Sequence, residues 1–391
     1  MAREPRRIAL MLDLQWQYKR HTAVFAGTQK YADEHGWHSI IDEFCYDTLS
    51  ARRRMPVPYD GIIARANHHL LRVARRQRVS VVNVWANSPV RDKLPGVFPN
   101  YAIIGQQSAE HLLHRGIRQF ATITPPKNHA QDRVVREFVR VIQQVAGSCL
   151  VENVPQNPYR DIAHWRRTEQ VLERCVSSWQ PPIGVYIADE VVGRMTVQAC
   201  QRRGLRVPAD VAIIVGQNDE PLCERPRPSL TSIEFGFERI GYEAARLLHS
   251  LMDGSQPPAE PMLLPPQGLF IRESTDFHAV QDELVAAALQ FISTNCHRPI
   301  GQHDVAKAVH AETRTLQNRF RKHLGHPIVA EIRRVRIERA KRELTQSKKR
   351  LSEIARDVGF GHSMRMYEVF RRELKITPGQ YRQQGLFRGE T

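Results

Sequence analysis

The chain has 391 residues, 41% hydrophobic and 25% charged, a balance that excludes an intrinsically disordered protein and predicts two or three folded domains. Lys and Arg number 57 against 41 Asp and Glu, which gives a formal net charge of +16. Residues 280–391 alone hold 22 basic and 12 acidic residues. A C-terminal third this basic predicts a polyanionic partner, most often nucleic acid.

The cysteines and the apolar runs indicate the cellular compartment of the protein. Its six cysteines are scattered singly and form no CxxC pair, so neither a zinc ribbon nor a thioredoxin motif is predicted. The apolar run at residues 8–12 is shorter than the core of a secretory signal, and no window approaches the ~18–20 apolar residues of a membrane helix. We therefore expect a soluble cytoplasmic protein without membrane association.

Short apolar runs rich in Val and Ile alternate with helical stretches from residue 7 to about residue 271. The predicted strands are residues 8–12, 61–64, 79–84, 120–124, 185–188 and 211–215. The predicted helices include residues 21–35, 106–115, 191–203 and 239–252. Consecutive apolar positions are typical of strands buried on both faces. Alternating strands and helices predict parallel sheets covered by helices, and a segment of this length suits two sheets.

The strand pattern stops after a Pro-rich stretch at residues 255–268, so we place a domain boundary near residue 278. This divides the chain into residues 1–278 and residues 279–391. The second part is helical throughout and holds two helix-turn-helix patterns, at about 302–323 and 351–374. A continuous helix predicted at 331–345 would span ~22 Å between them. Two recognition helices at such a separation can lie about one DNA turn apart.

In the first pattern, Leu316 and Phe320 lie at i and i+4 and predict the buried side of a recognition helix. Arg314, Gln317 and Asn318 would then point outward, and these residue types can pair with base edges in the major groove. In the second pattern Met366 and Phe370 form the corresponding buried pair. One basic helix alone would more often be a solvated surface, but the repetition of the whole pattern favours DNA binding.

This part of the chain resembles the DNA-binding domain of the AraC/XylS family of transcription regulators over about 100 residues. The motifs that match are Val305-Ala306, Leu316, Phe320, Gly325, Arg336, Ala340, Ile354-Ala355, Val358-Gly359-Phe360, Thr377-Pro378 and Tyr381-Arg382. The resemblance assigns base contacts to Arg314, Gln317, Asn318, Ser363 and Met364. It assigns phosphate contacts to Arg321, Lys322, Arg371, Arg372 and Lys375. Glu368 stands where the family often has Arg, which implies weaker or different base recognition by the second helix-turn-helix unit.

The first part resembles the sensor domains of LacI-type repressors and periplasmic binding proteins. The matching stretches, in the family's order, are residues 7–10, 59–63, 97–105, 114–121, 207–216, 230–233 and 240–245. The expected fold is therefore an α/β, periplasmic-binding-protein-like sensor of two lobes with parallel sheets, followed by an all-α domain with two helix-turn-helix motifs. The sequence contains no GxGxxG, GxxxxGK[ST] or GxSxG motif, so nothing in it indicates an enzyme. We therefore expect no catalytic residues, metal or cofactor.

Ligands of open α/β sheets bind outside the carboxyl ends of the strands. The loops after three predicted strands offer hydroxyl partners and an aromatic face for a sugar. The candidate ligand-binding residues are Gln15, Trp16, Tyr18, Asp189, Asn218 and Asp219. For Trp16 the alternative is interface packing, and for Asp189 and Asp219 it is capping of the following helix.

We therefore expect a sequence-specific transcription regulator, an activator by default for the family. The resemblance implies a small sugar effector, xylose or a similar aldose, a double-stranded DNA operator, contact with RNA polymerase and a homodimer. Two alternatives stay open. Turnover of a bound sugar would indicate a sugar-metabolising enzyme with a DNA anchor, and affinity independent of sequence would indicate an architectural DNA-binding protein.

Overall fold

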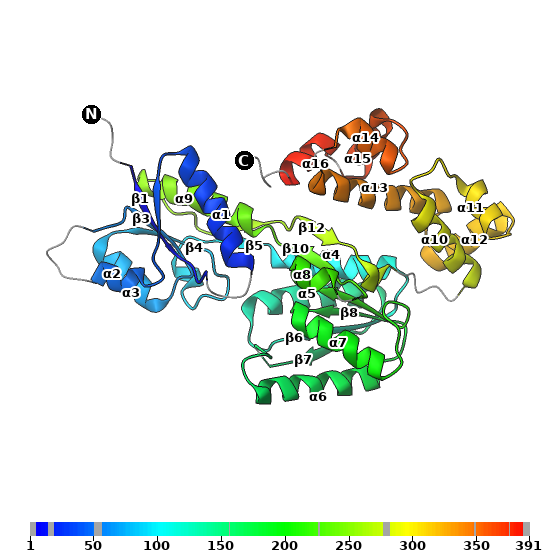
Figure 1. Cartoon of the computed structure of the whole chain (residues 1–391), viewed down its shortest axis with the longest axis horizontal. Coiled ribbons are helices and arrows are strands. Elements are labelled where there is room, and N and C mark those ends of the chain that lie inside the picture. Colours follow the sequence, from blue (N-terminus) through cyan, green and yellow to red (C-terminus); the bar gives the residue numbers. More distant parts are fainter. Residues whose placement is uncertain are drawn as a thin grey trace. The chain divides into compact units, whose positions relative to one another are not determined.

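The computed structural model describes residues 5–14, 19–50, 57–155, 157–225, 227–276, 282–347, 349–374 and 376–385. Within it the chain forms two compact units. The first comprises residues 1–106, 125–138 and 234–268, and the second comprises residues 107–124, 139–233 and 269–391. The predicted boundary near residue 278 lies outside the described residues, since 277–281 are not among them. Figure 1 shows the course of the chain.

The first unit is built on a four-stranded parallel sheet in the order β2-β1-β3-β4. Its strands are β1 (Arg7–Met11), β2 (His38–Ile41), β3 (Gly61–Ala64) and β4 (Ser80–Asn83). A two-stranded parallel pair joins β5 (Val97–Pro99) to β11 (Met262–Leu264). The helices of this unit are α1 (Lys19–Glu34), α2 (Cys45–Ser50), α3 (His68–Gln77) and α9 (Phe237–Met252), with the short helix η1 (Arg91–Lys93).

Alternate residues of β1 face two separate cores, as the two-residue period of a strand requires. Ile8 and Leu10 pack with α1 and α9, whereas Ala9 and Met11 pack with α2 and α3. Helices α1 and α9 lie side by side (Figure 1). Glycine permits this close packing, because a Cβ at Gly27 would lie 1.8 Å from the carbonyl oxygen of Glu238.

The α/β part of the second unit has a six-stranded sheet in the order β12-β10-β9-β8-β6-β7. Its strands are β6 (Gln119–Thr124), β7 (Leu150–Asn153), β8 (Ile183–Ile187), β9 (Val211–Val215), β10 (Thr231–Glu234) and β12 (Gly268–Phe270). Its helices are α6 (Ile162–Ser178), α7 (Glu190–Arg202), α8 (Glu220–Glu224) and η2 (Glu273–Thr275). Helices α4 (Tyr101–His114) and α5 (His129–Val145) each contribute residues to both units. Strands β8 and β9 are buried at every position, which confirms their prediction as buried strands.

From Asp282 onward the described chain is helical, as expected. Its helices are α10 (Glu283–Asn295), α11 (Gln302–Ala308), α12 (Thr313–Leu324), α13 (Ile328–Gln346), α14 (Leu351–Asp357), α15 (Ser363–Leu374) and α16 (Pro378–Gly385). Helix α13 is the predicted connecting helix, and it is longer than expected: its 19 residues span about 28 Å. The pairs α11–α12 and α14–α15 are the two helix-turn-helix units.

Candidate functional site

The first helix-turn-helix unit presents a polar helix face over an apolar core. Leu316 and Phe320 of α12 are fully buried, which confirms the predicted inward pair. The turn between α11 and α12 is closed by a hydrogen bond from Ala311 N to Ala306 O (2.9 Å). Because residues two positions before and after Leu316 lie on the other side of a helix, Arg314 and Asn318 are exposed.

Gln317 differs from its neighbours on α12, because it is only half-exposed. Its Nε2 donates a hydrogen bond to Oε1 of Gln302, the first residue of α11. The side chain therefore links the two helices of the unit. Reaching a base would require Gln317 to exchange this partner.

The second helix-turn-helix unit, α14–α15, repeats the arrangement of the first. Met366 and Phe370 of α15 are fully buried, as predicted, while Ser363 and Met364 lie exposed at the start of the helix. Met364 has 63% of its surface exposed, a high value for an apolar side chain. A methionine there can contact a thymine methyl group but cannot form the bidentate pairs of Arg or Asn.

Basic side chains surround both recognition helices. Arg321 and Lys322 are exposed in the last turn of α12, and Arg371 and Arg372 in the last turn of α15. Arg372 Nε donates to Glu373 (3.1 Å), and Arg371 lies 5.9 Å from the ring centroid of Tyr367. Lys375 lies outside the described residues.

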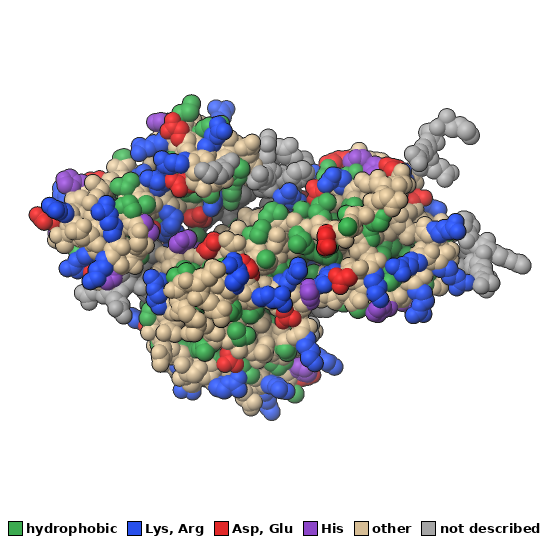
Figure 2. Space-filling view, turned by 180° about the vertical axis from the view of Figure 1, so that it is seen from behind, with side chains coloured by type: hydrophobic (Ala, Val, Ile, Leu, Met, Phe, Trp, Pro, Cys, Tyr) green, Lys and Arg blue, Asp and Glu red, His purple; other side chains and the backbone are tan. Residues whose placement is uncertain are grey.

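Arg365, which sequence patterns did not single out, is exposed in the first turn of α15 next to Met364. The signal was present, because Arg365 shares the outward face of α15 with two predicted base-reading residues. Charge alone would not have located these helices. In Figure 2 Lys and Arg side chains are spread over the visible face rather than gathered in one place.

Asp189 in the second unit follows β8 and caps helix α7. Its Oδ1 accepts hydrogen bonds from the backbone N–H groups of Val191 (2.8 Å) and Val192 (3.1 Å). This is the usual arrangement of an N-cap aspartate, whose carboxylate satisfies the otherwise unpaired donors of the first turn. Asp189 therefore caps the following helix, and its contact with a ligand stays a prediction.

Asp219 occupies the corresponding position at the start of α8 but behaves differently. Its side chain makes no capping hydrogen bond to α8, and it is half-buried. The two aspartates that sequence patterns could not separate thus differ in structure. Asp189 is committed to a helix terminus, and Asp219 is the one whose carboxylate does not cap.

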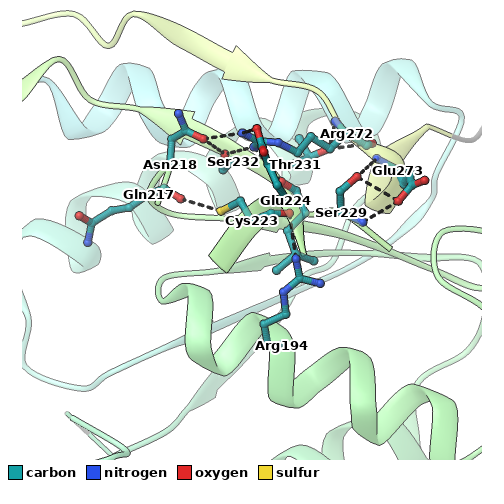
Figure 3. A network of polar contacts seen from close by, with 11 residues as sticks. Arg194, Gln217, Asn218, Cys223, Glu224, Ser229, Thr231, Ser232, Arg272 and Glu273 are labelled. Carbon is teal, nitrogen blue, oxygen red and sulfur yellow. Dashed lines mark hydrogen bonds and ion pairs between the residues drawn. The ribbon is translucent and has the colours of Figure 1, made fainter. Parts of the chain in front are cut away.

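Arg194 of α7 holds the segment that carries Asp219. Its guanidinium donates to three carbonyl oxygens, those of Leu222 (2.7 Å), Cys223 (2.8 Å) and Pro228 (2.7 Å). The Cys223 thiol donates to Gln217 O (3.6 Å) on the other side of Asp219. Figure 3 shows Arg194, Gln217 and Cys223 in this network. A loop fixed at both ends presents the Asp219 carboxylate at a defined position.

Asn218 is buried, with 6% of its surface exposed. Its Oδ1 accepts hydrogen bonds from Ser232 Oγ (2.9 Å) and from Arg272 Nη2 (2.8 Å) (Figure 3). The oxygen of the amide is therefore used inside the protein. Arg272 was not predicted from the sequence, because nothing local marks a residue that acts on a loop 54 positions away.

In the first unit the candidates Gln15, Trp16 and Tyr18 lie outside the described residues. Polar groups are present at the carboxyl ends of the neighbouring strands. Arg65 follows β3, lies 3.7 Å from the Asp13 carboxylate and stacks 4.7 Å from the ring centroid of Trp85, which follows β4. Burial lowers the pKa of Arg65 to about 10 and that of His21 to about 4. Arg65 and Trp85 were also missed, since neither belongs to the three loops from which the candidate ligand-binding residues were taken.

Two family models match the chain. Residues 109–275 match the periplasmic binding protein-like domain, and residues 305–384 match a helix-turn-helix domain. The xylose operon regulatory protein of Haemophilus influenzae is 27% identical over 390 residues, which are 96% of this chain and 98% of that protein. The chain thus combines a periplasmic binding protein-like domain with a C-terminal helix-turn-helix domain, and it is a DNA-binding transcription regulator similar to the xylose operon regulatory proteins.

The chain is also similar to a second relative and to two solved structures, which share its fold. The xylose operon regulatory protein of Escherichia coli is 25% identical over 383 residues, 96% of each chain. A solved structure of the xylose-binding transcription activator XylR has a TM-score of 0.57 at 22% identity and covers 98% of this chain and 99% of that chain. The complex of the regulator CelR with cellobiose has a TM-score of 0.56 at 19% identity and covers 68% of this chain and 84% of that chain. The regulator is a DNA-binding protein rather than an enzyme.

Within the described ranges, no helix of the regulator has the length and apolar character needed to cross a membrane. The same residues contain no group of three or more His, Cys, Asp or Glu side chains placed to hold a metal ion. All six cysteines are described, and all are free thiols.

Proposed function

We propose that the regulator activates transcription in the cytoplasm in response to xylose or a similar aldose. In this proposal it acts as a homodimer that binds an operator through residues 279–391, the reader, and contacts RNA polymerase, while residues 1–278, the sensor, bind the sugar. The observation that carries the proposal is the length of the match to the xylose operon regulatory proteins. It covers 96% of the chain, so the sensor and the reader are shared in the same order.

The sensor side of the proposal is supported by the two aspartates and the loop around them. A sugar hydroxyl needs an acceptor that is not already engaged, and the carboxylate of Asp219 does not cap a helix. The loop is held by Arg194 and Arg272, so it is organised before a ligand arrives. We propose Asp219 as the principal sugar-binding residue of the second unit. We propose that Asp189 and Asn218, which lie on the loops after β8 and β9, also contact the sugar.

The reader side is supported by the exposure of the predicted base-reading residues. Arg314, Asn318, Ser363 and Met364 are all exposed on α12 and α15, above the buried residues that fix each helix. We propose that these four, with Gln317 after release from Gln302, contact bases. Arg321, Lys322, Arg371, Arg372 and Lys375 would contact phosphates.

The first experiment measures sugar binding. Xylose, arabinose, ribose and glucose are titrated into the purified chain by calorimetry and thermal unfolding, and we expect one of them to bind. At 100 times the dissociation constant it should stabilise the native state by about 2.7 kcal/mol. Sugar alcohols of the same length serve as controls for osmolyte effects. The absence of heat and of stabilisation from all four aldoses would contradict the effector class.

The second experiment measures coupling, which separates regulation from the two alternatives. A duplex selected from random DNA by the chain is titrated with and without the sugar. If the sugar changes DNA affinity by some factor, the duplex must change sugar affinity by the same factor. We expect a factor of about 5 to 150. Sugar and DNA binding that are independent would indicate a DNA-anchored enzyme instead, and failure to select any sequence would indicate an architectural protein. Light scattering of the same complexes reports whether two chains bind one duplex.

A further inference from the structure

The two helix-turn-helix units have separate hydrophobic cores, although one helix belongs to both. Ile328 and Ile332 in the first half of α13 pack with α10, α11 and α12. Ile337, Ala340 and Leu344 in the second half pack with α14 and α15. The orientation of one helix-turn-helix unit relative to the other therefore depends on α13 and on the contacts made at its middle.

Arg336 lies at the point on α13 where burial passes from one core to the other, and it is 8% exposed. Its Nε donates to Cys296 O (2.8 Å), and its Nη2 donates to Arg298 O (2.8 Å) and Ile300 O (3.4 Å). Cys296 is the C-cap of α10, so the guanidinium satisfies a helix-terminal carbonyl. A planar fork with several donors can bind three carbonyl oxygens at once in one geometry.

Gly359, in the turn of the second helix-turn-helix unit, lies against Cys296 and Arg336. A Cβ at Gly359 would lie 2.1 Å from Cys296 O and 2.8 Å from Arg336 Nε, and its φ is +92°. The backbone of the second turn thus rests directly on the carbonyl that Arg336 holds. One contact joins the end of α10, the middle of α13 and the turn between α14 and α15.

We propose that Arg336 and Gly359 form a clamp that sets the separation of α12 and α15, and thereby the base-pair spacing that the regulator accepts in its operator. This role rests on the proposed DNA binding by the reader. Arg336 acts as a positioning residue, since its three acceptors are carbonyl oxygens of the protein. Adding one base pair between two contacted DNA segments moves one segment by about 3.4 Å along the axis and rotates it by about 35° relative to the other. A rigid connection between α12 and α15 should therefore discriminate between operators of different spacing.

Two pairs of variants test the clamp. Arg336→Met removes the three donors but keeps the apolar stem, and Arg339→Met is its control. Arg339 lies on the same helix and donates to Ser293 O (2.6 Å) of α10. Gly359→Ala forces the second turn away from Cys296. Its control is Gly361→Ala, two residues further on, because Gly361 also has a positive φ (+84°) but a Cβ there would meet no atom within 4 Å. Arg336→Lys retains the charge without the fork.

The first measurement uses the full-length chain and a duplex that the wild type selects from random DNA. Interference footprinting marks the two contacted segments, and one base pair is inserted or removed between them. We expect the wild type to lose about tenfold or more in affinity at either altered spacing, because one helix loses its base contacts. Arg336→Met and Gly359→Ala should bring the three spacings within about threefold of one another, and Arg336→Lys should fall between. Arg339→Met and Gly361→Ala should keep the wild-type profile.

The second measurement needs no DNA, so it separates the clamp from the DNA-binding function. Spin labels at Lys322→Cys on α12 and Glu368→Cys on α15, in a Cys149→Ser background, report the distance between the helices by pulsed electron resonance. Both labelled positions are exposed. We expect a narrow distribution in the wild type and a broader or displaced one in Arg336→Met and Gly359→Ala. An unchanged distance distribution in both variants would overturn the proposal. Variants that bind all three duplexes more weakly by the same factor, and so keep the wild-type preference for one spacing, would also overturn it.

Discussion

The Arg272 guanidinium and the Asn218 side chain are hydrogen-bonded to each other, and Ser232 joins them in a closed set of three. Arg272 Nη2 donates to Asn218 Oδ1 (2.8 Å), Arg272 Nη1 donates to Ser232 Oγ (2.6 Å), and Ser232 Oγ donates to Asn218 Oδ1 (2.9 Å). Arg272 Nη1 also donates to Leu230 O (3.0 Å). Arg272, which precedes η2, is therefore hydrogen-bonded to the loop that carries Asp219.

Arg272→Met should destabilise the α/β part of the second unit. It leaves Asn218 Oδ1 and Leu230 O without their charged donor, and losing hydrogen bonds to a charged group costs about 1.5–3 kcal/mol. We expect a lower urea midpoint with an unchanged slope. Arg246→Met is the control, because Arg246 pairs with Glu243 on an exposed part of α9 and such pairs contribute about 0–1 kcal/mol. A midpoint shift no larger than that of the control would show that the three-residue set adds little stability.

The strands that could be predicted from the sequence are those with no exposed face. Residues 61–64 and 211–215 are β3 and β9 with the expected bounds, because uninterrupted apolar runs define a strand buried on both sides. Strands β2 and β7 were not predicted. They lie at the edges of their sheets and are mostly exposed, so neither carries a continuous apolar run.

The candidate site could be predicted only as far as local patterns reach. The buried faces of α12 and α15 follow from i, i+4 spacing within a single helix. The difference between Asp189 and Asp219 does not, since both precede a helix and only the folded backbone decides which carboxylate caps. Arg272 and Arg194 could not be predicted from local patterns, because each donates hydrogen bonds to residues 28 or more positions away in the chain.

DNA binding by the regulator should depend steeply on salt. Arg321, Lys322, Arg371 and Arg372 are exposed beside the recognition helices, and each phosphate contact releases counterions. A reader with six to ten such contacts loses about 10³–10⁵ in affinity between 50 and 200 mM salt. Fluorescence anisotropy with the selected duplex measures the slope. A fragment of residues 1–278 that binds this duplex as tightly as the full chain would contradict the assignment of the reader.

Arg314→Ala and Asn318→Ala should each reduce affinity for the selected duplex far more than for random DNA. Bidentate contacts to a base are worth about 1–3 kcal/mol of discrimination, which random sequences do not offer. Lys322→Ala is the matched control on the same helix and should weaken both DNAs alike. Equal losses on the two DNAs for Arg314→Ala and Asn318→Ala would mean that these side chains contact phosphates.

Acid should destabilise the first unit through His21. Burial lowers the pKa of folded His21 to about 4, while the unfolded side chain titrates near 6.5. Between these values the unfolded chain binds a proton that the folded chain does not, so the His21 contribution to stability is lost as pH falls from 6.5 to 4. His21→Gln should show a shallower loss of stability over this window in urea unfolding. His68→Gln, at an exposed position of α3, should follow the wild type. Identical pH profiles for His21→Gln and the wild type would remove His21 as the cause.

Asp219→Ala should weaken sugar binding without weakening the fold. A carboxylate that accepts a sugar hydroxyl forms a charge-assisted bond worth about 1.5–3 kcal/mol. Its loss should therefore raise the dissociation constant of the sugar by about ten- to a hundredfold. Because the side chain makes no capping bond to α8, the unfolding free energy should stay within about 0.5 kcal/mol of the wild type.

Asp189 provides the matched comparison, because it precedes a helix in the same way but caps it. Asp189→Ala should lower the unfolding free energy by about 1 kcal/mol through loss of the cap, whereas Asp189→Asn should restore that stability. Calorimetry with the sugar that the wild type binds and urea unfolding of the three variants give both quantities. Operator affinity without sugar should be unchanged in Asp219→Ala, since the reader is untouched. Unchanged sugar affinity in Asp219→Ala would exclude Asp219 from the site, and unchanged stability in Asp189→Ala would show that the cap contributes nothing.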